Sequence, residues 1–201
     1  MNTPRDFFKT ATADILYSTG ELITCNVLWI LACLPVITIP PAFGGLYYST
    51  YKLAKQEHVT WRTFLEGFRL YFWASWRFAG ANLLIYSFLS FDFIITNQIA
   101  AEWSSILQGT YLGFLVLWTA AQIFTFPFIL AQEQPRLRLA WRNSISLYFK
   151  HFGFALLLTL GLTLILVVNY WLWPLMFILT GSLLAYLSNL GMLYLLQKEL
   201  R

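Results

Sequence analysis

The sequence predicts an all-α integral membrane protein: a polytopic helix bundle of five long spans, a short return helix and amphipathic helices at the cytoplasmic surface. Hydrophobic residues make up 59% of the 201 residues and charged residues only 11%, whereas soluble domains carry about 25% charged residues. The apolar runs are continuous and lack the alternation of a membrane β-barrel. We expect one integral membrane domain, residues 1–201, whose first partner is the lipid bilayer.

The N-terminal part predicts a surface helix followed by a helical hairpin. Residues 6–18 carry their apolar side chains near one face, as in a helix that lies on a membrane. Residues 22–39 form the first span. Pro40 and Pro41 end it because proline has no N–H to donate, so residues 41–55 are expected to return as a short helix. Gly44 and Gly45 would let another helix approach closely.

The remaining chain alternates surface helices with spans. Residues 60–72 place Arg62, Glu66 and Arg69 on one face of an interfacial helix, opposite a face that holds Phe64, Leu65, Phe68 and Phe72. Residues 137–148 resemble a second interfacial helix. Further spans are expected at 76–95, 111–130, 152–168 and 174–196, with a polar loop at 96–109.

Two segments are similar to each other. "TWRTFLEGFRLYF" and "AWRNSISLYFKHF" share Trp-Arg and an aromatic end, and each leads into a span. They indicate either a parallel repeat of span, surface helix and span or the common appearance of interfacial helices.

The positions of Lys and Arg predict the orientation. Residues 52–77 hold five and residues 136–150 hold four, whereas the loop at 96–109 holds none. The positive-inside rule therefore places both basic segments and the C-terminus in the cytoplasm. A hairpin at 22–55 puts the N-terminus there as well. The alternative is five spans with an external N-terminus. The expected location is the inner (plasma) membrane.

The stretch "NVLWILACLPVITIPPAFGGLYYSTYKLAKQE", followed by "FLEGF", resembles the signature of the YesL family of bacterial membrane proteins. Asn26, Pro35, Thr38 and Pro41 fall on that signature, and Pro40 departs from it, since the family usually has Gly there. The resemblance covers about residues 22–70. It implies no reaction, because the activity of the family is uncharacterised. Its members are often encoded beside carbohydrate uptake transporters.

Four polar side chains fall within or beside the later spans. Asp92 is a functional candidate because ionisable groups at lipid depth are rare, or it lies among outer headgroups that water reaches. Asn82, Gln122 and Asn169 would join it in a transport route, or they join helices by hydrogen bonds. Asn26 is expected to bond backbone groups freed by a kink at Pro35. No catalytic, metal or cofactor signature is present, so the sequence predicts neither an enzyme nor a bound cofactor.

The sequence is compatible with two kinds of function. The first is a non-enzymatic accessory or scaffold protein that contacts another membrane protein, such as a carbohydrate transporter. The alternative is a small transporter or channel. Gly181, Ala185 and Ser188 would form a small-residue face in the last span, which suits packing inside the bundle or against a partner. The basic residues of the two surface segments would bind lipid headgroups or a partner: Arg62, Arg69, Arg138 and Arg142. No nucleic-acid partner is expected.

Overall fold

The computed structural model describes residues 3–98, 103–172 and 176–200, and every element in these ranges is helical. This confirms the all-α class. In chain order the elements are α1 (Pro4–Tyr17), α2 (Thr19–Cys33), the 3₁₀ turn η1 (Val36–Thr38), α3 (Ile39–Ala54), α4 (Trp61–Leu70), α5 (Phe72–Gln98), α6 (Ser104–Gln122), α7 (Thr125–Leu130), α8 (Leu137–Lys150), α9 (Phe152–Trp171), the π-helical turn η2 (Met176–Thr180) and α11 (Gly181–Glu199).

Four helical stretches in the described ranges are long and apolar enough to cross a membrane: 72–96, 104–130, 152–171 and 178–199. Helices α1 and α2 would make a fifth only as one span bent by 75°. The first expected span, residues 22–39, is therefore shorter than predicted, because α2 ends at Cys33. Pro35 takes an extended backbone conformation and has no N–H with which to continue the helix. The start of the last expected span, residues 174–175, lies outside the described residues.

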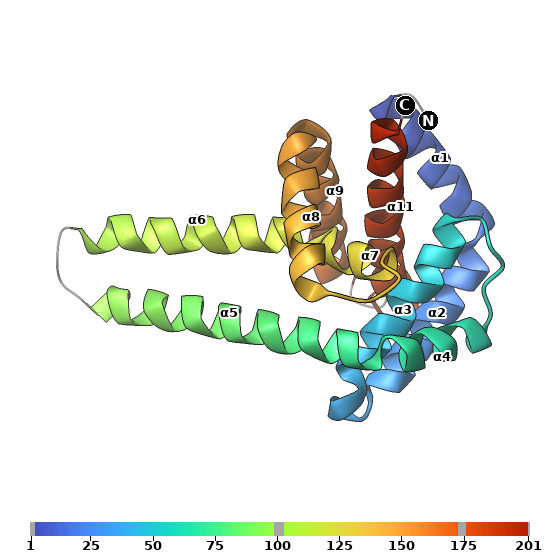
Figure 1. Ribbon diagram of the computed structural model, residues 1–201, viewed down its shortest axis with the longest axis horizontal. Helices are drawn as coiled ribbons and strands as arrows, with labels where there is room; N and C mark the ends of the chain where they lie inside the picture. Colours follow the sequence, from blue (N-terminus) through green and yellow to red (C-terminus); the bar gives the residue numbers. More distant parts are fainter. Residues whose placement is uncertain (1–2, 99–102, 173–175, 201) are drawn as a thin grey trace.

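Helices α5 and α6 form a long antiparallel pair that extends away from the other helices (Figure 1). In the same view α9 and α11 run across the direction of this pair, so the long helices do not share one axis. The loop expected at 96–109 is much shorter, since α5 continues to Gln98 and α6 begins at Ser104. In α5, the Thr96 hydroxyl donates a hydrogen bond to the carbonyl of Asp92 at 2.7 Å. This bond satisfies the hydroxyl within the helix, so Thr96 does not end it.

The long helices differ in how much of their surface other helices cover. Only 11% of the most apolar stretch of α5 is buried within the protein, against 61% for the stretch that contains α11. A helix that is apolar all round and uncovered needs lipid as its solvent. The surface of α5 is therefore compatible with contact with a lipid bilayer, and α11 is the centre of the folded core.

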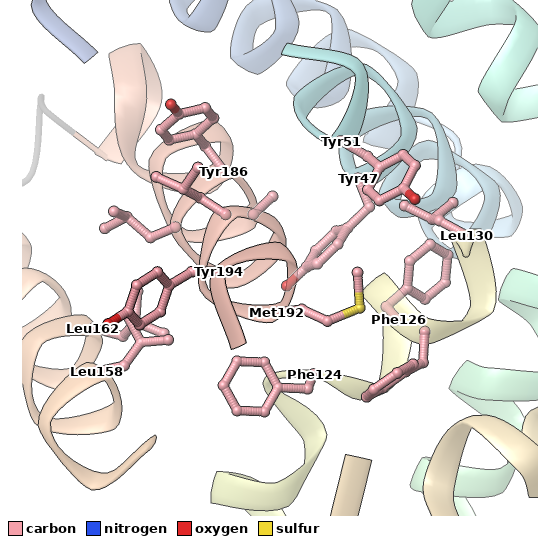
Figure 2. Packing of buried hydrophobic residues seen from close by; sticks show 14 of the residues in the cluster. Tyr47, Tyr51, Phe124, Phe126, Leu130, Leu158, Leu162, Tyr186, Met192 and Tyr194 are labelled. Atoms are coloured by element: carbon pink, nitrogen blue, oxygen red, sulfur yellow. The ribbon is translucent and has the colours of Figure 1, made fainter. Parts of the chain in front are cut away.

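The core gathers around α11 (Figure 2). Tyr186, Met192 and Tyr194 of α11 are each at most 2% exposed. Phe124, directly before α7, and Phe126, within α7, are buried in the same cluster. The small-residue face of α11 also points inward, against α2 and α3: a Cβ added at Gly181 would lie 2.8 Å from the side chain of Trp29. Ala185 is fully buried, so of the two alternatives for this face the structure shows packing inside the bundle.

Helix α1 packs on the core and does not lie free on a surface. Phe7 is fully buried, with its ring centre 5.3 Å from that of Tyr194 and 5.0 Å from that of Phe154. Asp14 accepts hydrogen bonds from the Tyr186 hydroxyl and the Gln56 amide, both at 3.2 Å. These contacts hold the N-terminal helix against α11 and the end of α3.

The two similar segments of the sequence occupy corresponding places in the order of elements. Helix α4 precedes the long helix α5, and α8 precedes the long helix α9. Each is itself preceded by a helix with Thr-x-Pro at its start: Thr38-Ile39-Pro40 before α4, and Thr125-Phe126-Pro127 before α8. The order proline-containing helix, amphipathic helix and long helix thus occurs twice, as a parallel repeat would require.

Candidate functional site

The turn between α2 and α3 is closed by Thr38. Its hydroxyl lies 2.6 Å from the carbonyl oxygens of both Ala32 and Pro35. The Ala32 carbonyl lies in the last turn of α2, where the helix no longer supplies donors, and Pro35 directly precedes η1. Thr38 thus bonds backbone beside Pro35, where Asn26 was expected to act. Pro40 and Pro41 sit in the first turn of α3, where a missing N–H costs nothing.

Asn26 instead joins α2 to α11. Its side chain is fully buried, and its Oδ1 accepts a hydrogen bond from the backbone N–H of Ser182 at 3.0 Å. Ser182 lies in the first turn of α11, directly after the π-helical turn η2, where the hydrogen-bond register changes. A buried amide oxygen thus satisfies a backbone donor 156 residues away in the sequence.

Helix α4 lies very close to α3 at two glycines. A Cβ at Gly45 would be 2.9 Å from the carbonyl oxygen of Phe64, and a Cβ at Gly67 would be 2.5 Å from Cβ of Tyr48. At Gly44 the neighbour is Ser75 of α5, and its Oγ would be the atom in contact. The two adjacent glycines of α3 therefore contact two different helices: Gly45 lies against α4 and Gly44 against α5.

This packing decides which face of α4 is outside. Phe64 and Gly67 are buried against α3, but Leu65, expected beside Phe64 on an apolar face, is exposed. The outward face carries apolar and charged side chains together and lines a shallow groove of six residues: Trp61, Arg62, Leu65, Glu66, Arg69 and Leu70. The expected apolar face is confirmed at Phe64, which is buried, and at Phe68, which is partly buried against the core, and Leu65 departs from it.

The two basic helices are separate features. Arg138 and Arg142 are exposed on α8, whose buried side holds Ala140, Ser144, Leu147 and Tyr148. Figure 1 shows α4 and α8 apart, with α3 and α7 between them. Near α4, Lys52 forms a salt bridge with Glu57 at 2.8 Å, and this contact lowers the pKa of the Glu57 carboxyl.

The three amides predicted for a transport route each join a different pair of elements. Trp118 of α6 donates to Oδ1 of Asn82 in α5 at 3.1 Å. Trp141 of α8 donates to Oε1 of Gln122 in α6 at 3.2 Å. The Thr180 hydroxyl of η2 donates to Oδ1 of Asn169 in α9 at 2.6 Å. The structure does not bring these amides together, and Asp92 lies apart from them toward the far end of α5.

A cavity of about 540 Å³ lies where the α5–α6 pair meets the other helices. Its size is within the range of about 300–1,000 Å³ that is usual for small-molecule sites. The walls come from α3, α5, α6, α9 and α11, and no charged residue is among them. The lining consists of Phe43, Tyr47, Phe78, Leu115, Val116, Thr119, Ala120, Gln122, Ile123, Thr159, Leu162, Thr163, Leu166, Leu184 and Ser188.

The polar groups of this cavity are hydroxyls and one amide. Thr163 and Ser188 donate to carbonyls of their own helices, at 2.9 and 2.8 Å. The Ser188 hydroxyl also hydrogen-bonds with that of Tyr47, whereas Thr163 keeps lone pairs that can accept. Gln122 is oriented by Trp141: an indole N–H can only donate, so the amide oxygen faces it. Asn82 and Asn169 do not line the cavity, so a polar path through all three amides is not formed by the described residues.

Sequence reasoning missed the donors that organise these amides. Trp118 and Trp141 are essential partners of Asn82 and Gln122, yet tryptophan in such a protein is usually assigned to the membrane interface. The position of Trp118 could have indicated this role, because Trp118 lies inside an apolar run and not at its end. Asn189 likewise joins α11 to α3 through the carbonyl of Tyr47 and the hydroxyl of Thr50, both at 3.0 Å.

Comparison with known proteins gives one similarity. Residues 22–93 match a family described as "Protein of unknown function, DUF624". The matched segment contains the α2–α3 hairpin, α4 and most of α5, which are the elements joined through Gly44, Gly45 and Gly67. No curated protein and no solved structure matches the chain. The similarity is therefore to a family of unknown function, in the part of the chain that builds the turn and the outward face of α4.

Proposed function

We propose that this chain is a non-enzymatic accessory membrane protein of the YesL type, which acts by contact with another membrane protein. The observation that carries the proposal is the outward face of α4. Trp61, Leu65 and Leu70 are exposed there beside Arg62 and Arg69, and tryptophan and arginine are the residue types that most often dominate protein interfaces. The same helix is held rigidly on α3 at Gly67, so little side-chain and backbone freedom remains to be lost on binding.

The hydrogen bonds of the amides favour this function over the small transporter. Ion-coupled transport needs polar groups that converge on a route through the bundle. Here Asn82, Gln122 and Asn169 are each used to join helices, and the cavity that contains Gln122 is mostly apolar. These groups stabilise the helix arrangement, as amides in membrane helices commonly do.

The first partner to test is a carbohydrate uptake transporter, which the family resemblance implies. A photo-crosslinking amino acid at Arg69 or Arg142, in native membranes that contain the active transporter, is expected to form an adduct with a transporter membrane subunit. The control position is Leu164 on α9, which is 62% exposed on a lipid-facing helix and should give lipid adducts. Mass spectrometry identifies the products. Adducts with lipid and with the chain itself alone, at all three positions, would contradict the accessory function.

We further propose that α4, α8 and both termini are cytoplasmic and that the turn at Pro35–Pro41 faces outward. The support is the distribution of Lys and Arg between segments. A single cysteine at Ile37, 68% exposed, in a background without Cys25 and Cys33, is expected to react with an impermeant maleimide added to intact cells. A cysteine at Arg142 should react only after the cells are opened. Ala42, although close to the turn, is fully buried and is unsuitable. Labelling of Ile37→Cys only in opened cells would overturn the orientation.

A further inference from the structure

We propose that the cavity between α3, α5, α6, α9 and α11 binds a neutral membrane lipid, one with an apolar chain and an uncharged polar end that carries ester carbonyl and hydroxyl groups. Diacylglycerol and monoacylglycerol are lipids of this class. The proposal is independent of the accessory function. It rests on where the cavity opens, on the absence of charge from its walls and on the hydrogen-bond capacity left inside it.

The opening of the cavity lies between two apolar helices. Val116 of α6 is 57% exposed and Leu166 of α9 is 52% exposed, and both line the cavity. Each lies well inside a helix that is long and apolar enough to cross a membrane. A ligand therefore reaches the cavity sideways from the hydrocarbon of the bilayer, which selects molecules that are already dissolved there.

The walls select against charge. Apolar side chains such as Phe43, Phe78 and Leu162 dominate the lining, and no Lys, Arg, His, Asp or Glu is part of it. Moving an ionised headgroup into such a site costs far more than moving a neutral one, since no opposite charge compensates the loss of water. A phosphate-bearing lipid would have to leave its headgroup outside the cavity.

The remaining polar groups define what the neutral end must carry. Gln122 turns its amide oxygen to Trp141, and no described residue accepts from its NH₂ group. This group requires an acceptor such as an ester carbonyl, because unsatisfied donors are costly at lipid depth. The hydroxyl of Thr163 already donates to the carbonyl of Thr159, so it is left to accept from a hydroxyl. One donor and one acceptor on the walls thus fit a carbonyl and a hydroxyl on the same ligand.

The test uses the full chain in phosphatidylcholine vesicles that contain one photoactivatable probe at equal mole fraction: a diazirine-bearing diacylglycerol, phosphatidylglycerol or fatty acid. The diacylglycerol probe is expected to label the segments 115–123 and 159–166 several-fold more than the two charged probes do. Gln122→Leu should weaken this labelling roughly two- to tenfold, the equivalent of one hydrogen bond. Thr163→Phe should abolish it by filling the cavity.

The matched control is Val167→Phe, which adds the same bulk to an exposed position of α9 that does not line the cavity. It should leave labelling unchanged. Elution of every variant as a single species in detergent shows that it is folded, and Gln122→Leu, which adds no bulk, keeps the test informative if Thr163→Phe fails to fold. Equal labelling by the charged probes, or equal labelling of wild type, Gln122→Leu and Thr163→Phe, would overturn the proposal.

Discussion

Replacement of Gly67 by alanine is expected to force α4 away from α3 and to lower the free energy of unfolding by about 1–3 kcal/mol, the usual cost of overpacking. The added Cβ would lie 2.5 Å from Cβ and 2.7 Å from Cδ1 of Tyr48. Because Cβ is held by the backbone of α3, it cannot swing aside as the end of a flexible side chain can. The helices themselves must separate, and the outward face of α4 moves with them.

Gly80→Ala is the matched control for this variant. Gly80 lies within α5, and a Cβ there meets nothing within 4 Å. Alanine should stabilise the helix at this position by about 0.5–1 kcal/mol through its higher helix propensity. Thermal unfolding in mild detergent measures both variants, and their difference isolates the packing cost at Gly67. Equal stability of the two variants would show that α4 does not depend on close contact with α3.

The Gly67 variant also connects packing with the proposed function. If α4 acts as a rigid contact surface, then a chain with Gly67→Ala that still inserts in the membrane should lose its crosslink from Arg69 to the partner. A crosslink from Arg142 on α8 should persist, because α8 packs on other helices. Loss of both crosslinks would indicate general unfolding, and retention of both would argue against a role for the position of α4.

Replacement of Asn26 by leucine is expected to lower the free energy of unfolding by about 1–3 kcal/mol, the cost of an unsatisfied buried group. Leucine is similar in size to asparagine, so the main change is chemical. The N–H of Ser182, which donates to Asn26 Oδ1 at 3.0 Å, would lose this acceptor in a buried place, where Ser182 is fully covered. Helix α11 should then detach from α2 at its first turn.

Thr24→Leu is the matched control for Asn26→Leu. Thr24 is exposed on the same helix, and its hydroxyl donates only to the carbonyl of Gly20, within α2. This replacement should change stability by no more than about 0.5 kcal/mol, as is usual for exposed sites. Unfolding in a series of mixed detergent micelles measures the two variants. A loss of stability at Thr24 as large as that at Asn26 would contradict a specific role for the bond to Ser182.

The all-α class and the approximate places of the long helices were determined by the sequence alone. Both depend on properties that are local to a segment: the length of an apolar run and its lack of charge. The end of the first span was predicted at Pro40 and Pro41, but α2 already ends at Cys33, before Pro35. The sequence also predicted two amphipathic surface segments, and these correspond to α4 and α8.

Only the tertiary structure decided which groups meet. The side of α4 that is buried depends on glycines in another helix, and the partner of Asn26 is 156 residues away. Gln122 was visible as a polar residue in an apolar run, but its orientation depends on Trp141 of another helix, and the cavity needs five helices to form its walls. Such contacts depend on how helices cross and pack. The spacing of apolar residues along one helix does not show which other helix packs against it. The composition of each segment therefore determined where the chain is apolar, and packing between segments determined which of its few polar groups remain free to bind.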